Sequence, residues 1–194
     1  ALGTEHRFGT RLIATGPISG GVLNGDLILA GGGDPTLETD GLASLAANLA
    51  KTGLREVRGR LLVWGGAVPF TRAIDETQPE HAGYNPALSG LNLNYNRVHF
   101  EWRRANGKYA ITMDARSDCY RPDVTMARMR IADRNVPVYS YKDAGSYDDW
   151  TVALGALGTG GARWLPVRKP ELYAGEVFAT FARSQGIKTG APQV

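Results

Sequence analysis

The sequence predicts an α+β fold in which antiparallel hairpins pack with at least two helices. Short segments alternate apolar and polar residues and end at glycine, asparagine or proline, which is typical of hairpin strands. Two longer segments instead repeat apolar residues with the 3.6-residue period of a helix. The chain has 194 residues, 43% of them hydrophobic, so it is long enough for one core or for two small ones.

The first predicted hairpin joins residues 8–15 to a strand that lies within the stretch from Gly21 to Leu37. We expect a kink in that strand at Asn24-Gly25 and its end at the triple glycine 31–33, before Asp34-Pro35. The glycines match neither the Gly-Lys-Ser/Thr ending of a phosphate loop nor the Gly-x-Gly-x-x-Gly dinucleotide fingerprint. We therefore interpret them as a strand end where the backbone packs closely.

A change of period after Pro35 predicts an amphipathic helix. Its apolar residues fall at i, i+3, i+4, i+7 and i+8: Leu42, Leu45, Ala46, Leu49 and Ala50. Thr39 or Asp40 is the expected N-cap, and Gly53 lies just beyond the last turn. A strand is predicted next, from Val57 to Trp64.

Residues 65–90 form a long predicted loop, a type of segment that is often functional or covers another part of the molecule. The clearest hairpin follows, with Asn106-Gly107 as its turn. Its apolar positions alternate with charged ones: Val98, Phe100, Trp102, Tyr109, Ile111 and Met113.

Three further strands and a closing helix complete the prediction. The strands span residues 127–131, 136–141 and 150–154. The helix begins at Pro170 and ends at Gly186. Its apolar face consists of Ala174, Val177, Phe178, Phe181 and Ala182.

Composition argues against several classes of partner. The formal net charge of +3 is too small to indicate nucleic-acid binding. No apolar run approaches the length of a membrane span, and Ala1-Leu2-Gly3-Thr4 has no signal-peptide character, so we expect a soluble chain that is a trimmed form or a fragment. The single cysteine, Cys119, excludes an internal disulfide.

Neither a metal site nor a cofactor site is predicted. The three histidines are scattered at positions 6, 81 and 99, without a His-x-x-x-His pairing or a cysteine pair. His99 falls on the polar side of a strand, so we expect it at the solvated surface. Cys119 lies beside Asp118, which gives no support to an activated thiol. Asp148-Asp149 could supply half of a glycosidase pair, but we expect solvated turn residues.

One region is richer in positive charge than the rest: Arg97, Arg103, Arg104, Lys108, Arg116, Arg121, Arg128, Arg130 and Arg134. Interleaved with Trp102 and Tyr109, these residues could bind an anionic polymer. The favoured interpretation is that they occupy the solvent-facing sides of strands.

The stretch Gly21–Leu37 reads Gly-x-Leu-x-Gly-Asp-Leu-x-Leu-x-Gly-x-Gly-Asp-Pro-Thr-Leu. It resembles the signature that follows the nucleophile helix in low-molecular-mass penicillin-binding proteins of the D-Ala-D-Ala carboxypeptidase/endopeptidase (DacB-like) family. Other blocks resemble the same family: Arg7-Phe8-Gly9-Thr10, residues 51–59, residues 84–96 and residues 173–187. The resemblance runs from end to end and is weakest between about Asp114 and Asp149.

The resemblance places this chain between the Ser-x-x-Lys and Ser-x-Asn motifs of the family. No serine of the chain has lysine at the third following position, and none begins Ser-x-Asn. Lys-Thr-Gly occurs at Lys51-Thr52-Gly53, where a helix end explains it, and at Lys188-Thr189-Gly190, before the place where Ser-x-Asn would fall. The chain is thus expected to be the inserted accessory region, residues 1–194, without catalytic residues of its own.

The resemblance also implies an organisation and a setting. An outer domain would comprise residues 1–37 plus 105–194, and an inner domain residues 38–104. The parent would be a periplasmic, serine-type D-Ala-D-Ala carboxypeptidase/endopeptidase that acts on peptidoglycan and is inhibited by penicillin. Its partners would be the peptidoglycan stem peptide and the catalytic domain that this chain lacks.

Two residues are implied as substrate contacts. Family members present an aromatic and an acidic residue over the cleft from the loop before the residue 84–96 block. Tyr84 matches the aromatic residue, and Glu80, four positions earlier, is the candidate acid. For Tyr84 a place in the core is an equal alternative.

Two other functions stay open. A free-standing module could bind an anionic glycan or a protein partner through the arginine-rich strands and loop 65–90. An independent enzyme using Lys188 is the remotest interpretation.

Overall fold

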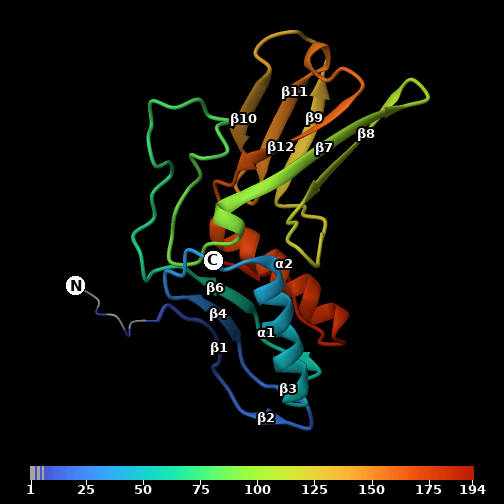
Figure 1. The fold of residues 1–194 in the computed structure, drawn as a ribbon. Helices are drawn as coiled ribbons and strands as arrows, with labels where there is room; N and C mark the ends of the chain where they lie inside the picture. The colour runs from blue at the N-terminus through green and yellow to red at the C-terminus, as the bar shows by residue number, and fades with distance from the viewer. Residues whose placement is uncertain (1–2, 4, 6) are drawn as a thin grey trace.

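Two helices pack side by side against a four-stranded sheet in the lower part of Figure 1. The computed structural model describes residues 3, 5 and 7–194. The strands run in the order β1 (Thr10–Ala14), β4 (Leu27–Gly31), β6 (Leu61–Trp64) and β13 (Pro192–Gln193). β1 is antiparallel to β4, whereas β4–β6 and β6–β13 are parallel pairs. The helices are α1 (Thr39–Lys51) and α2 (Pro170–Ser184).

The first predicted hairpin is confirmed, and the chain breaks at the expected kink. β3 (Val22–Leu23) leaves the main sheet and pairs with β2 (Ile18–Ser19) and β5 (Glu56–Val57) in a small second sheet. The strand predicted over 57–64 is likewise split into β5 and β6. The two breaks lie beside each other, where the backbones at Gly25 and Gly59 are in close contact. A Cβ on Gly59 would be 2.4 Å from the carbonyl oxygen of Gly25.

The triple glycine is a close backbone crossing, as interpreted from the sequence. A Cβ on Gly31 would lie 2.3 Å from the carbonyl oxygen of Gly90, and the Gly33 amide donates to that same oxygen at 2.7 Å. The end of β4 therefore holds the segment that closes loop 65–90.

Both predicted helices are present, with one correction at a cap. The N-cap of α1 is Glu38 rather than Thr39 or Asp40. Thr39 is buried, and its hydroxyl donates to the carbonyl oxygen of Ala115 at 2.8 Å, so tertiary contacts use the groups that would cap the helix. α2 begins with Pro170 in its first turn, as predicted.

A second group of strands stands above the helices. β7 (Arg97–Ala105) and β8 (Lys108–Asp114) form the predicted hairpin, which projects at the upper right of Figure 1. Its turn has positive φ at Asn106 and Gly107, 51° and 78°. β12 (Gly160–Pro166) pairs with β7, a strand that the sequence does not predict because Gly160-Gly161-Ala162-Arg163 lacks alternation.

The remaining sheet has the order β10-β11-β9. Its strands are β9 (Ala127–Ala132), β10 (Tyr139–Asp143) and β11 (Asp148–Ala153), close to the three predicted segments. β11 is parallel to β9 and antiparallel to β10. Two single-turn 3-10 helices, η1 (Asn94–Asn96) and η2 (Leu154–Ala156), complete the elements.

One hydrophobic cluster runs through both groups of strands. It includes Leu29 of β4, Leu42 of α1, Tyr173 and Phe178 of α2, and Trp150 of β11. The proposed division into residues 38–104 and their two flanks stays a prediction, and the main sheet draws strands from both of its parts.

In the described part of the chain, the other face of the main sheet is left open as a groove. Ile13, Ile28, Leu62 and Trp64 lie along it and line a groove of about 810 Å³. The Trp64 side chain is 51% exposed. An apolar sheet face of this kind is typical of a surface that packs against another part of a protein.

Candidate functional site

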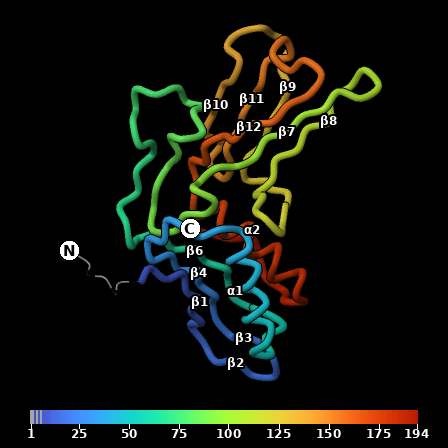
Figure 2. Tube along the Cα trace, in the orientation of Figure 1, coloured from blue at the N-terminus to red at the C-terminus, as the bar shows by residue number. Residues whose placement is uncertain are grey.

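Loop 65–90 runs along one side of the molecule between the main sheet and β10, as the tube in Figure 2 shows. Thr71 and Leu88 close it with a two-residue antiparallel bridge. The imidazole of His81 lies against the ring of Tyr139 in β10, with 5.1 Å between ring centroids. The loop thus has a defined course although it contains no helix and no named strand.

A pocket of about 360 Å³ opens between this loop and the segment that leads into β7. We call it the loop pocket. Apolar side chains and aromatic rings make most of its wall. Its lining residues from the loop include Ile74, Tyr84, Pro86 and Leu88, and those from the other side include Tyr95 and Arg97.

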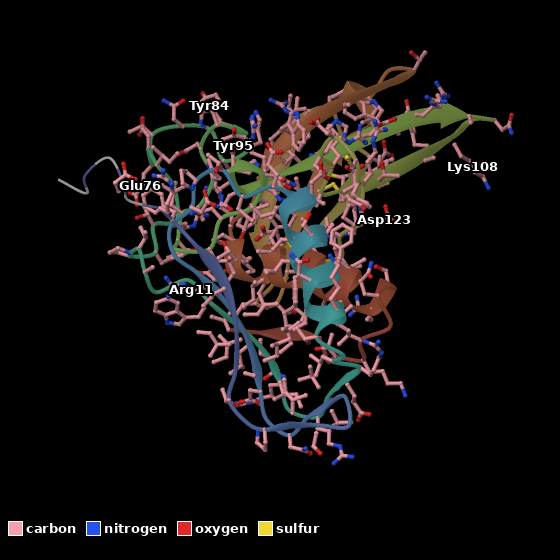
Figure 3. All side chains as sticks on the ribbon, turned by 60° about the horizontal axis from the view of Figure 1, so that its bottom comes forward. Arg11, Glu76, Tyr84, Tyr95, Lys108 and Asp123 are labelled. Carbon is pink, nitrogen blue, oxygen red and sulfur yellow. The ribbon has the colours of Figure 1, made fainter. Side chains whose placement is uncertain are left out.

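Tyr84, the aromatic residue implied by the family resemblance, lines the loop pocket. Its side chain is 69% exposed, so the alternative of a core position does not hold. The hydroxyl donates to the side-chain oxygen of Gln78 at 2.8 Å, which fixes the ring's direction. Figure 3 shows Tyr84 and Tyr95 on the same side of the molecule.

Glu80, the candidate acid, is held differently. Its carboxylate accepts a hydrogen bond from Arg72 at 2.6 Å and lies 3.5 Å from the Nε atom of Arg168. It lines a separate pocket of about 320 Å³ and does not line the loop pocket. The two residues implied by the resemblance therefore belong to one loop but not to one cavity.

Arg168 is the residue that holds the loop, and sequence reasoning missed it. It is only 5% exposed. Its guanidinium donates to three loop carbonyl oxygens, those of Arg72 (2.8 Å), Asn85 (2.7 Å) and Glu80 (2.8 Å). Burial lowers the pKa of this guanidinium, and the Glu80 carboxylate opposes the shift. Nothing in the local sequence marks Arg168 as different from the many exposed arginines.

Asp148 fixes the backbone of Arg168 in turn, which corrects the expectation of a solvated turn residue. Asp148 is fully buried in β11. Its carboxylate accepts from the Arg168 amide at 2.8 Å and from the Tyr141 hydroxyl at 3.0 Å. Burial raises the pKa of this carboxyl, while the two hydrogen bonds act in the opposite direction. Asp149 pairs with Arg130 at 2.6 Å instead, so the two adjacent acids have different partners.

His99 is a second correction, because it is 7% exposed and not at the solvated surface. Cross-strand pairing sets it opposite Asp114 and Trp164, and its ring meets Trp164 edge-on. Asp114 accepts two hydrogen bonds from Arg116, at 2.9 and 2.7 Å. Burial and the nearby Arg116 charge lower the His99 pKa. His99 occupies a polar position in the alternating pattern of its strand, but that face of the sheet is covered. The pattern of a single strand does not show which of its faces will be covered.

The arginine-rich run is largely engaged in internal contacts. Arg130 pairs with Asp149, Arg116 with Asp114 and Glu101, and Arg134 donates to the Pro137 carbonyl oxygen and the Thr151 hydroxyl. The alternative of a basic face that binds an anionic polymer thus gains no support from these three arginines.

Among the described residues no hydrogen bond joins a serine to a lysine, the contact that would activate a nucleophilic serine. Lys51 donates to Asn48 at the end of α1, and the backbone of Lys188 bonds to Arg55 and Val57 beside β5. Cys119 is exposed, and the Asp40 carboxylate raises its pKa, which disfavours a thiolate.

Over residues 3, 5 and 7–194 no group of three or more histidine, cysteine, aspartate or glutamate side chains is placed to hold a metal ion. His6 lies outside the described residues. None of the helices in the described part of the chain is both long and apolar enough to span a membrane.

The sequence matches the model of the D-Ala-D-Ala carboxypeptidase 3 (S13) family over residues 1–191. A D-alanyl-D-alanine carboxypeptidase of Actinomadura sp. (strain R39) is 39% identical over 95 residues, which cover 47% of this chain and 18% of that protein. A D-alanyl-D-alanine carboxypeptidase DacB of Haemophilus influenzae is 40% identical over 63 residues, 32% of this chain and 13% of that protein. The matched segments are thus small parts of both relatives.

The fold is similar to that of penicillin-binding protein 4 (DacB) from Haemophilus influenzae. One crystal structure of that protein aligns with a TM-score of 0.65 and 20% identity, covering 95% of this chain and 42% of that chain. A second, complexed with a novel β-lactam, aligns with a TM-score of 0.66 and 20% identity, covering 100% of this chain and 42% of that chain. At this identity the likeness shows the α+β fold, and the chain spans less than half the length of the protein it resembles.

Proposed function

Because this chain belongs to the D-Ala-D-Ala carboxypeptidase 3 (S13) family, we propose that it is the accessory region of a serine-type carboxypeptidase/endopeptidase that cleaves peptidoglycan stem peptides. The observation that carries this proposal is the family match over residues 1–191 of a chain that spans only 42% of a solved family-like structure. The names of the matched relatives, which are D-alanyl-D-alanine carboxypeptidases and a penicillin-binding protein, support the substrate class.

In this proposal the chemistry lies outside these 194 residues. A serine peptidase of this kind needs a serine activated by a neighbouring lysine, and the sequence contains no Ser-x-x-Lys. The parent's serine would attack the D-Ala-D-Ala carbonyl carbon, expel the terminal D-Ala and be released from the acyl-enzyme by water. β-Lactams would trap the same serine, and the setting would be the periplasm.

The open face of the main sheet supports this accessory role, because it offers a surface on which the catalytic domain could pack. Trp64 and Ile13 are exposed in the isolated chain, Ile28 and Leu62 beside them are half-buried, and the catalytic domain of the parent would cover all four. The partner of this face would then be another part of the same polypeptide.

Intact-mass spectrometry before and after a fluorescent penicillin tests the proposal. We expect a mass near 20.9 kDa without an adduct for this chain, and one penicilloyl group on a longer protein that includes the flanking motifs. A stoichiometric adduct on the 194-residue chain would contradict the accessory role. Failure of the longer protein to react would contradict the enzyme class.

Tyr84 and Glu80 enter the same proposal as residues that face the stem peptide. Tyr84 is exposed and directed by Gln78, so Tyr84→Ala in the longer protein should lower kcat/KM on a stem peptide by about tenfold. Tyr84→Phe keeps the ring and is the matched control. Glu80→Gln should mainly disturb the ion pair with Arg72, so we expect a smaller kinetic effect. Equal rates for wild type and Tyr84→Ala would remove Tyr84 from the site.

A further inference from the structure

We propose that a groove on the projecting hairpin binds an uncharged sugar unit, with Glu101 and Arg103 as its hydrogen-bonding partners. This hairpin groove has a volume of about 490 Å³ and is lined by β7, by residues 159–162 around the start of β12 and by Arg116. It shares no lining residue with the loop pocket. The sugar class follows from the groove itself, whereas a glycan strand of peptidoglycan as the source of the sugar rests on the proposed function.

Strand pairing builds the floor of the hairpin groove. His99, Glu101 and Arg103 lie on one face of the β12-β7-β8 sheet, because side chains alternate along a strand. This face is covered at His99 and opens beyond it, toward the turn of the hairpin. The cross-strand neighbours of Glu101 and Arg103 are small and exposed: Ala162, Thr112, Gly160 and Ala110. The carboxylate and the guanidinium therefore stand on a flat, open surface.

Both of these side chains have unused hydrogen-bonding capacity. The Glu101 carboxylate is 39% exposed and accepts one hydrogen bond, from Arg116 at 3.0 Å. Arg103 is exposed, and over residues 3, 5 and 7–194 no carboxylate lies within ion-pair distance of it. An ionised carboxylate only accepts and a guanidinium only donates. A ligand that carries several hydroxyl groups can serve both, because each hydroxyl is a donor and an acceptor.

The charges that line the hairpin groove balance. Arg116 is neutralised by buried Asp114, which accepts from it at 2.9 and 2.7 Å. The two remaining charges, on Glu101 and Arg103, are opposite in sign. An anion in the groove would be repelled by Glu101, and a cation would be repelled by Arg103. The lining therefore favours a polar ligand without net charge.

At the inner end of the groove, His99 offers a polar atom that lacks a partner. The residue lines the groove although it is only 7% exposed. Its Nδ1 atom is buried without a hydrogen-bond partner and lies 4.0 Å from the Asp114 carboxylate. That negative charge favours the ring proton on Nδ1, which leaves Nε2 as an acceptor for a ligand hydroxyl. Buried polar atoms without partners are uncommon in folded proteins, so this one is a second indication of a binding site.

A sugar ring fits this arrangement better than a free amino acid, which also has no net charge. Glu101 and Arg103 are two residues apart on an extended strand, so their Cα atoms are about 7 Å apart. Hydroxyl groups on opposite sides of a hexose ring can reach both side chains, whereas the ammonium and carboxylate of an amino acid are attached to one carbon. The described lining also contains no leucine, isoleucine, valine, phenylalanine or methionine that would receive an apolar side chain.

The test is an NMR titration of the 194-residue chain that follows the backbone amides of Gly160 and Gly161, which line the groove. Triacetylchitotriose is the N-acetylated probe, and cellotriose is the same β-1,4-linked trisaccharide without acetamido groups. Alanine is the zwitterionic control. Glu101→Ala and Arg103→Ala remove the proposed partners. Arg104→Ala is the matched control variant, because Arg104 is exposed on the opposite face of the same strand.

We expect triacetylchitotriose to shift both amides with a Kd of about 1 mM, as suits an open polar groove. Glu101→Ala and Arg103→Ala should each weaken binding at least about fivefold, and Arg104→Ala less than about twofold. The circular dichroism spectrum of each variant checks that it is folded.

Three results would overturn the proposal: no shift with either trisaccharide at about 10 mM, unchanged affinity in both groove variants, or equal shifts with alanine. Binding of cellotriose without triacetylchitotriose would support the sugar groove and count against a peptidoglycan source. The penicillin-adduct experiment does not involve this groove, so the two proposals can fail separately.

Discussion

At the scale of single residues, the position of loop 65–90 depends on one buried guanidinium and the carboxylate behind it. Arg168 donates to carbonyl oxygens at three points of the loop, and Asp148 accepts from the Arg168 amide. Carbonyl oxygens in a covered segment need donors, and here a side chain from the end of β12 supplies them. Glu80 and Tyr84 therefore owe their positions to residues far away in the sequence.

Arg168→Gln should lower the free energy of unfolding by about 2–4 kcal/mol, because three carbonyl oxygens lose charged donors in a covered place. Urea unfolding followed by fluorescence measures the change. Arg183→Gln is the matched control, since exposed Arg183 donates only to the Thr180 hydroxyl and should change stability by less than about 0.5 kcal/mol. Similar losses in both variants would mean that Arg168 does not carry the loop.

Asp148 predicts a dependence of stability on pH. Burial raises its pKa in the folded state, so between the unfolded value of about 3.9 and the raised value the folded protein holds a proton that the unfolded chain has released. The contribution of Asp148 to stability should therefore fall as pH rises through that window and stay constant above it. In Asp148→Asn this fall should disappear, because an amide preserves the shape and does not titrate.

Urea unfolding of both proteins at several pH values from 3.5 upward gives the comparison. The stability of wild type relative to Asp148→Asn should decrease with increasing pH. A relative stability that increases with pH would show that the hydrogen bonds from Arg168 and Tyr141 outweigh burial and that the carboxyl pKa is lowered.

At the scale of elements, α2 packs against the sheet at Gly175, where no room is left for a side chain. A Cβ at this position would be 2.6 Å from a methyl carbon of Val63 and 2.7 Å from the Cβ of Pro192. The glycine therefore sets the distance from α2 to β6 and β13, a detail that the helical period of the sequence does not contain.

Gly175→Ala should reduce the free energy of unfolding by about 1–3 kcal/mol through overpacking, despite alanine's better helix propensity. Gly41→Ala is the matched control, because Gly41 is an exposed position of α1 and its new Cβ would meet only the end of the flexible Leu37 side chain at 3.2 Å. We expect this control to be neutral or up to about 1 kcal/mol more stable. Thermal unfolding of both variants measures the difference, and a stabilised Gly175→Ala would show that α2 can move away from the sheet without cost.

At the scale of the whole molecule, the question is whether the nested division from the family resemblance corresponds to separate folding units. One hydrophobic cluster connects the lower sheet, α2 and the upper strands, and β4 and β6 pair across the proposed boundary. A shared core and a shared sheet couple the two parts.

We therefore expect a single thermal unfolding transition for the 194-residue chain, with equal calorimetric and van't Hoff enthalpies. Differential scanning calorimetry measures both. Two resolved transitions would instead favour independent domains at 38–104 and in the flanks, and Gly175→Ala would then shift the transition that contains α2.

The sequence by itself determined the fold class, both helices, the hairpin at Asn106-Gly107, the close backbone crossing at the triple glycine and the family. These features depend on the period of the apolar residues, on turn residues and on long motifs, all of which involve residues close together in the sequence. The sequence also placed Tyr84 on loop 65–90, but it did not predict the pocket that Tyr84 lines.

Only the tertiary structure decided which polar residues are buried and which groups meet. Asp148 and His99 looked like surface residues because a strand pattern does not say which faces are covered. Arg168 looked like an ordinary basic residue, and its role arises from carbonyl oxygens that distant segments bring together. Burial and charge pairing are properties of the assembled fold, since they depend on contacts across long sequence separations.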